Sequence, residues 1–194
     1  MIQRHLFLPA MILSGAFLLS GCVGLFAIGA GAGVSSANDP RSLGTQVDDE
    51  NIESRALSKI RERDDISTQS EIEVVSYNRI VLVIGQTPNK GYKTEIGELI
   101  ANVPNVRKVY NEVRVGAPAG SLAGASDTTI TTKVKSSLLT ESGFPSNRVK
   151  VVTESKVVYL LGLVTREQAE KATELARVVS GVEKVVQLFE MVES

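Results

Sequence analysis

The chain has 194 residues, 43% of them hydrophobic, and its 21 Lys and Arg against 22 Asp and Glu leave a formal net charge of -1. That length suits one medium domain or two small ones, and a near-neutral surface argues against a nucleic-acid partner. The single histidine, His5, and the single cysteine, Cys22, both lie near the amino terminus. Because the body lacks the usual general bases and thiol nucleophiles, we expect a non-enzyme with no catalytic residues, metal site or cofactor.

The amino terminus has the pattern of a bacterial export signal. Residues 1–21 contain one arginine followed by the apolar run Leu6–Leu19. The run ends in Leu-Ser-Gly-Cys, a lipobox-like tetrad, which predicts cleavage and acylation at Cys22. The alternative is a membrane helix extended by residues 23–34. In lipoproteins of this type, an Asp directly after the lipidated cysteine tends to retain the protein in the inner membrane. Val23 stands at that position here. We therefore expect an outer-membrane protein, lipid-anchored and facing the periplasm.

Two stretches rich in small and polar residues divide the rest of the chain. Residues 22–47, which include "SSANDPRSLGTQ", are predicted to form a flexible tether behind the lipidated cysteine. Residues 116–125, within "VGAPAGSLAGAS", are predicted to form a linker. These breaks define one module over residues 48–115 and a second over residues 126–194.

The two modules have matching sequences. Offsets of 78, 77 and 76 relate equivalent positions, namely Asp49 with Asp127, Val74 with Val151, and Val106 with Val182. A register that drifts by only one residue on either side indicates an internal duplication.

Each copy is predicted to fold as helix, strand, strand, helix, strand. In the first, Asp49 is placed to cap a helix whose core face carries Ile52, Ala56 and Ile60. The strands "IEVVSY" and "IVLVIG" follow, joined by a turn at Asn78-Arg79. A second helix over about residues 89–102 and a final strand "KVYNEVRV" complete the unit.

The second copy repeats this order. Ile130, Val134 and Leu138 form the core face of its first helix, and "RVKVVTE" and "VVYLLGLV" form its first two strands. "REQAEKATELARVVS" is the second helix and "KVVQLFEMV" the last strand. The sequence therefore predicts an α+β protein of two tandem αββαβ modules, each a three-stranded sheet covered on one face by two helices.

This repeated unit, with a glycine late in the second strand and a "GV..V" entry to the third, resembles the BON domain of bacterial envelope proteins. The resemblance implies a non-enzymatic protein that binds anionic phospholipids such as phosphatidylglycerol or cardiolipin, associates with the division site and supports outer-membrane integrity. It also implies that the first helix of the second module contacts the lipid. The family commonly has Trp where this chain has Thr129.

The first helix of the second module contains no carboxylate between Asp127 and Leu139. Spacing of 100° per residue turns hydroxyls, one or two ammonium groups and an apolar tip away from the core. We predict that the hydroxyls donate to lipid phosphates, with help from the helix amino terminus, and that Leu139 enters the acyl boundary. An ordinary solvated helix face is the alternative. The predicted phospholipid contacts are Thr128, Thr129, Thr132, Lys133, Lys135, Ser136 and Leu139.

The modules differ in charge. The first has 12 acids and 10 bases, net -2, whereas the second has 9 of each. Glu50, Glu53 and Glu62 should keep the first module's leading helix away from anionic lipid, so that module is the better candidate for contacting an envelope protein or its sister module. The alternative functions are an adaptor for outer-membrane assembly machinery or cell-wall amidase regulation, and a peptidoglycan-binding element.

Overall fold

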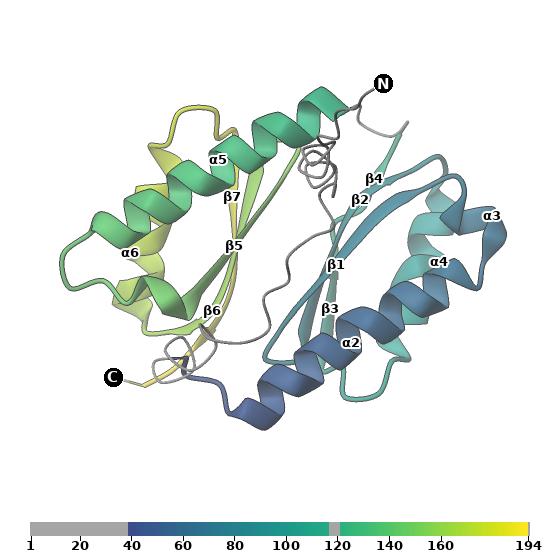
Figure 1. The fold of residues 1–194 in the computed structure, drawn as a ribbon, viewed down its shortest axis with the longest axis horizontal. Coiled ribbons are helices and arrows are strands. Elements are labelled where there is room, and N and C mark those ends of the chain that lie inside the picture. The colour runs from purple at the N-terminus through teal and green to yellow at the C-terminus, as the bar shows by residue number, and fades with distance from the viewer. Residues whose placement is uncertain (1–38, 117–120, 194) are drawn as a thin grey trace, which may run out of the picture.

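Each module in the computed structural model is built from one small sheet and helices that cover one of its faces, and the structure describes residues 39–116 and 121–193 (Figure 1). The first module contains α2 (Leu43–Arg61), α3 (Asp64–Ser67), β1 (Glu71–Tyr77), β2 (Ile80–Thr87), α4 (Lys90–Ala101), β3 (Lys108–Asn111) and β4 (Arg114–Val115). The second contains α5 (Ser121–Thr140), a 3₁₀ turn (Ser146–Arg148), β5 (Val149–Glu154), β6 (Val157–Val164), α6 (Arg166–Arg177) and β7 (Lys184–Met191).

The predicted α+β class and the repeated αββαβ order are confirmed. Three local differences distinguish the copies as described: the short helix α3 occurs only in the first module, the 3₁₀ turn only in the second, and the first module's last strand is divided into β3 and β4. The predicted signal peptide and Cys22 lie outside the described residues. Within the described ranges, no helix combines the length and the apolar character that a membrane crossing needs.

The helices form where the sequence places apolar residues at helical spacing. The predicted core face of α2 is buried in full, as is that of α5; these residues are Ile52, Ala56, Ile60, Ile130, Val134 and Leu138. Each set packs against one face of its own sheet together with the second helix of the module.

Both sheets follow the same plan. The first two strands pair in antiparallel register through a tight turn, and the third strand returns in parallel beside the second after the helix. Asn78 and Arg79, the predicted turn residues, have φ of 52° and 64°, and Ser155 and Lys156 have 49° and 62°. Two consecutive positive φ values define the type I′ turn that matches the twist of a hairpin.

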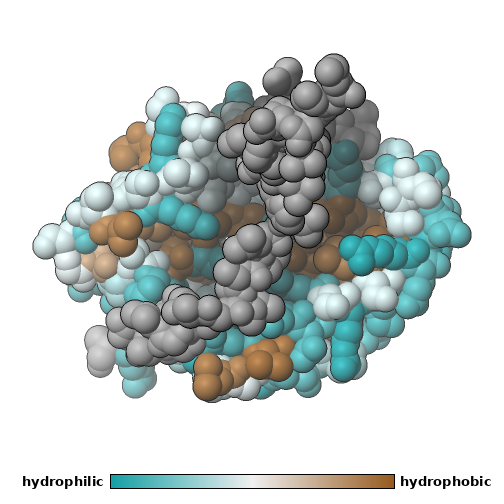
Figure 2. All heavy atoms as spheres, viewed as in Figure 1, coloured by the Kyte–Doolittle hydropathy of each residue, from teal (hydrophilic) through white to brown (hydrophobic). Residues whose placement is uncertain are grey.

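The face of each sheet that carries no helix packs against the other sheet (Figure 1). The molecule therefore has four layers, with helices outside and the two sheets in the middle. This inter-sheet core includes Tyr77, Leu82 and Ile84 of the first module and Tyr159 and Leu161 of the second. Apolar colour in the middle of the face seen in Figure 2 lies where these sheets meet, between outer surfaces that are largely polar.

The leading helix of each module begins before the residue at which the module was predicted to start. α2 begins at Leu43, where the Ser42 hydroxyl accepts from the Thr45 N–H at 3.1 Å, so the structured body begins inside the predicted tether. α5 begins at Ser121, inside the predicted linker. Small residues such as Ala and Ser are compatible with a helix as well as with a linker. Their abundance therefore did not show where the linker ends and the helix begins.

Candidate functional site

The predicted lipid contacts lie on one exposed strip of α5, here called the α5 outer face: Thr128, Thr129, Thr132, Lys133, Lys135, Ser136 and Leu139. All seven side chains are exposed. In particular, the first module covers neither Thr132 nor Lys135. Leu139 is 73% exposed, a high value for a large apolar side chain. The arrangement that would have excluded a membrane contact, burial of this strip under the sister module, is not found.

Asp127 holds α5 against its sheet. The carboxylate is only 6% exposed and accepts hydrogen bonds from the backbone N–H groups of Ser155 at 2.6 Å and Lys156 at 2.8 Å. These are the two turn residues of the β5–β6 hairpin, whose N–H groups point out of the turn. A short acceptor on the helix therefore satisfies both donors and sets the orientation of α5.

Asp49 does the same in the first module and does not cap its helix, so the predicted cap is wrong. It lies within α2, is 3% exposed, and accepts from the N–H groups of Asn78 at 2.8 Å and Arg79 at 2.7 Å. The Ser76 hydroxyl donates to it at 2.6 Å. An Asp before an apolar helical run resembles a cap in sequence, whereas its partners here lie about thirty positions further along the chain.

The threonine hydroxyls of the α5 outer face are engaged differently from the prediction. Thr128, Thr129 and Thr132 donate to the carbonyls of Gly124, Ala125 and Thr128, four residues earlier, at 2.9 to 3.0 Å. Their oxygens therefore present acceptor lone pairs to the outside, which suits ammonium or hydroxyl groups better than phosphate oxygens. Thr131, the neighbour of Thr132, is half-buried and donates to Thr153 at 2.7 Å.

The positive charge on this face is uncompensated within the described part of the chain. Neither Lys133 nor Lys135 has an ion pair there. Glu141, the first acid after α5 ends at Thr140, is paired with Lys171 of α6 at 2.8 Å, and that hydrogen bond raises the pKa of Lys171. Because the helix begins at Ser121, its amino-terminal dipole lies more than a turn away from Thr128 and adds little.

The best-formed hollows in residues 39–116 and 121–193 do not enclose a ligand. Two shallow hollows, of about 430 and 250 Å³, open to solvent beside β7 and beside Asp127. No group of three His, Cys, Asp or Glu side chains in these ranges is arranged to hold a metal ion. The α5 outer face is thus a candidate for contact with an extended surface and not for enclosing a small ligand.

Ion pairs between the two modules lie at the edge of the inter-sheet core, and the sequence did not predict them. This edge is here called the junction. Lys150 of β5 contacts the Glu53 carboxylate at 3.2 Å, and Arg107 contacts Glu190 of β7 at 2.9 Å. Residues Asp39–Ser42, which were expected to belong to the tether, lie beside this junction. The uninterrupted apolar run of β2 is the sequence signal that could have indicated contact between the two sheets, because such a run is typical of a strand buried on both faces.

The comparisons with known proteins agree with the repeated architecture. The family described as BON domain matches residues 48–117 and again residues 126–193. The chain is 35% identical over 184 residues to the Outer membrane lipoprotein DolP of Haemophilus influenzae, covering 95% of each chain. It is 40% identical over 155 residues to the 21 kDa hemolysin of Actinobacillus pleuropneumoniae, covering 80% of each, and 29% identical over 157 residues to the Osmotically-inducible protein Y of Escherichia coli K12, covering 79% of this chain and 78% of the relative.

Solved structures show only a distant likeness. The C-terminal domain of CdsD, the structural protein of the type III secretion system of Chlamydia trachomatis, superposes on 72% of this chain and 96% of its own with 12% identity and a TM-score of 0.31. A second structure of CdsD covers 72% of this chain and 91% of its own, with 13% identity and a TM-score of 0.30.

Proposed function

The chain belongs to the BON-domain family and carries two copies of the domain, and from this premise we propose that it is an outer-membrane lipoprotein that binds anionic phospholipid through its second module. The lipoprotein assignment is supported by the lipobox-like residues before Cys22 and by the similarity to DolP along almost the whole chain. In this proposal the anchor at Cys22 holds the protein in the outer membrane with its body in the periplasm, and the body contributes binding, not catalysis.

The observation that carries the lipid-binding proposal is the charge of the α5 outer face. Lys133 and Lys135 project from a helix that has no acid between Asp127 and Glu141, and Glu141 is paired with Lys171. A lysine near an anionic membrane surface contributes about 1 kcal/mol, and the contribution falls off within about 10 Å at ordinary salt. Two lysines and one apolar side chain give weak binding, suited to a protein that is already held at the membrane.

The lipid anchor and the α5 outer face then act together. A single acyl chain binds a membrane only marginally, whereas two or more hold the protein stably. Once the anchor is inserted, contact of α5 with the membrane becomes an intramolecular step, so a weak face is sufficient. Because Thr128, Thr129 and Thr132 donate within their own helix, the ammonium groups and the Ser136 hydroxyl supply the donors to phosphate in this proposal.

Co-sedimentation with lipid vesicles tests the proposal. A soluble fragment of residues 39–194 contains every described core contact and lacks the anchor. We expect it to bind vesicles that contain phosphatidylglycerol or cardiolipin, to bind phosphatidylcholine vesicles poorly, and to be released by salt. Lys133→Glu and Lys135→Glu each replace an attraction by a repulsion, so each should weaken binding by about 2 kcal/mol, roughly thirtyfold.

The sister module supplies a matched control. Arg55 is exposed on α2 and lies 78 positions before Lys133, the offset that also relates Asp49 to Asp127. Arg55→Glu changes the net charge as much as Lys133→Glu and should leave vesicle binding unchanged. Equal recovery on neutral and anionic vesicles, or equal loss with Arg55→Glu and Lys133→Glu, would contradict binding through α5.

Association with the division site and a role in outer-membrane integrity belong to the same proposal. If α5 provides them, a fluorescent fusion of the full chain should lose its midcell enrichment, and cells should become sensitive to detergent, with Lys135→Glu and not with Arg55→Glu. An envelope partner of the first module would be detected by crosslinking from α2, in a complex that persists with Lys135→Glu.

A further inference from the structure

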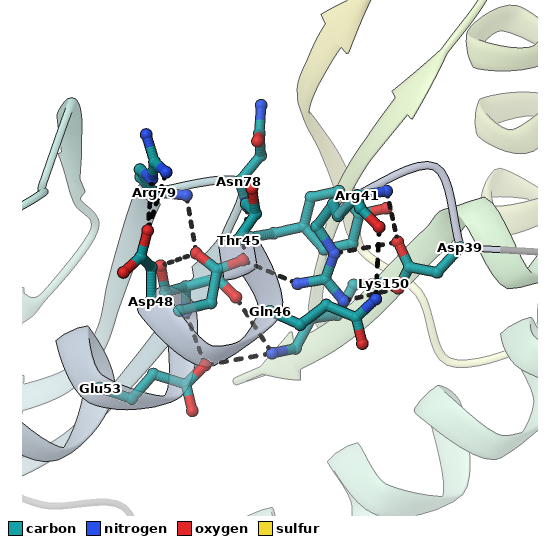
Figure 3. A network of polar contacts seen from close by, with 12 residues as sticks. Asp39, Arg41, Thr45, Gln46, Asp48, Glu53, Asn78, Arg79 and Lys150 are labelled. Atoms are coloured by element: carbon teal, nitrogen blue, oxygen red, sulfur yellow. Dashed lines mark hydrogen bonds and ion pairs between the residues drawn. The ribbon is translucent and has the colours of Figure 1, made fainter. Parts of the chain in front are cut away.

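The segment Asp39–Ser42, here called the strap, lies at the junction of the two modules, although its composition predicts a solvated tether. Figure 3 shows Arg41 directed into a cluster that contains Asp39 and reaches the start of α2. The Arg41 and Asp39 side chains are each only 14% exposed. We propose that the strap is docked on the junction, so that the end of the tether and both modules move as one body.

Arg41 has two carboxylate partners in this position. One guanidinium nitrogen contacts the Asp39 carboxylate at 2.7 Å and the other contacts Asp49 at 2.8 Å. The Asp39 carboxylate also accepts from the Arg41 backbone N–H at 2.9 Å, which closes a tight local loop. A guanidinium withdrawn from water is costly unless carboxylates and hydrogen bonds surround it, and here both do.

Asp49 connects the strap to the first module. The carboxylate that Arg41 contacts is the one that accepts from the turn residues Asn78 and Arg79 and from Ser76. The strap is therefore bonded to the group that orients α2 against its hairpin. Loss of Arg41 would leave a nearly buried carboxylate with neutral donors only.

Tyr77 connects the strap to the second module. The Arg41 guanidinium lies 4.0 Å from the centroid of the Tyr77 ring, a cation–π contact. Tyr77 is 5% exposed within the inter-sheet core, and its hydroxyl donates to the carbonyl of Arg148, just before β5, at 3.4 Å. Burial raises the pKa of Tyr77 to about 12, consistent with a ring enclosed between the sheets.

The strap's chemistry distinguishes it from the equivalent residues of the second copy. At the offset of 78 that relates Asp49 to Asp127, Asp39 corresponds to Ala117 and Arg41 to Ala119, while Pro40 corresponds to Pro118. The segment before the second module thus keeps the proline and lacks both charged groups. Only the segment that continues toward the membrane anchor carries the residues that bind the junction.

Trypsin tests docking directly, because the protease must take the Arg41 side chain into its own specificity pocket before it cuts the Arg41–Ser42 bond. The substrate is the full chain in detergent, and a synthetic peptide of residues 36–47 gives the rate for the undocked sequence. We expect cleavage after Arg41 in the protein to be at least about 100-fold slower than in the peptide. Cleavage at the peptide's rate would overturn the proposal.

Asp39→Asn separates docking from folding, because it weakens the strap and leaves Arg41, Asp49 and both cores in place. It should accelerate cleavage after Arg41 by about tenfold, the effect of losing one charged partner. The matched control is Asp65→Asn, because Asp65 and Arg63 form an ion pair at the same two-residue spacing on the exposed surface. That control should leave cleavage after Arg41 unchanged, and an equal acceleration would overturn the proposal.

Hydrogen exchange tests the connection to the second module. With Arg41→Ala in the full chain, we expect faster amide exchange in peptides covering residues 39–47 and 71–79 and also in those covering 148–154. A change confined to residues 39–47 would show that the strap is a local feature and would overturn its role in holding the modules together. Asp39→Asn should give the same pattern with a smaller amplitude, which keeps the test valid if Arg41→Ala folds poorly.

Discussion

The buried aspartates that clamp each leading helix to its hairpin predict a large and unequal loss of stability on substitution. Asp127→Asn retains shape but replaces one acceptor oxygen by an amino group. Two backbone N–H groups, of Ser155 and Lys156, currently donate to that carboxylate at 2.6 and 2.8 Å. In the variant one of them keeps an acceptor and the other faces an N–H₂ donor.

The magnitude follows from these contacts. A hydrogen bond to a charged group contributes about 1.5–3 kcal/mol, and a buried donor left without a partner costs about 1–3 kcal/mol. We therefore expect Asp127→Asn to lower the free energy of unfolding by about 3 kcal/mol. Asp49→Asn likewise leaves one of its two turn N–H groups without an acceptor. It also weakens the bond from Ser76 and removes the charge that faces Arg41, so its loss should exceed that of Asp127→Asn by about 1–3 kcal/mol.

Urea unfolding followed by circular dichroism measures both variants. Asp65→Asn serves as the control, because Asp65 is an exposed partner of Arg63 and its loss should leave the urea midpoint unchanged. A loss below about 0.5 kcal/mol for Asp127→Asn would show that the hydrogen bonds from the hairpin turn to Asp127 do not stabilise the module as argued. Equal losses for Asp49→Asn and Asp127→Asn would show that the bond from Arg41 adds nothing to the first clamp.

Two further predictions concern the strands. A Cβ on Gly162 of β6 would lie 2.3 Å from the Arg148 carbonyl oxygen, closer than non-bonded atoms approach, so Gly162→Ala should lower the free energy of unfolding in urea by about 2–4 kcal/mol. Gly124→Ala on α5, where nothing lies within 4 Å, is the control and should be neutral or stabilising. A neutral Gly162→Ala would contradict the packing. Glu73 is exposed on β1, but partial desolvation of its carboxylate and then the neighbouring charge of Glu154 raise its pKa, against the opposing effect of Lys150. The stability that goes with its protonated form is fully present below the unfolded pKa of about 4.5 and is lost as the pH rises through the higher folded pKa. Glu73→Gln should therefore match the wild type in urea midpoint near pH 4 and exceed it at pH 7, and a difference that is independent of pH would contradict this.

The local elements of this protein follow closely from its sequence. The core faces of α2 and α5 lie at the positions that helical spacing predicts, and the Asn78-Arg79 turn lies where two β-rich runs meet. The duplication strengthened each assignment, because two copies of a pattern had to satisfy the same register. Periodicity and turn chemistry act over a few residues, so a single chain displays them directly.

The candidate site was predictable in position but not in hydrogen bonding. Spacing alone placed Thr132 and Lys135 on the outside of the helix, and they are exposed. Thr128 and Thr129 donate to the carbonyls of Gly124 and Ala125, which belong to the helix because α5 begins at Ser121 and not near Asp127. Because the predicted helix started too late, its hydroxyls were expected to be free to donate to phosphate, whereas they donate to carbonyls of their own helix.

The two modules, their strand and helix order, and the carboxylate-free helix face could be predicted from the chain, because each depends on residues close together in it. The packing of the bare sheet faces, the binding of hairpin turns by Asp49 and Asp127, and the place of Arg41 at the junction became clear from the folded protein alone. Those contacts join groups far apart in sequence. Their stability comes from burial and from charged partners that meet only after both modules have folded.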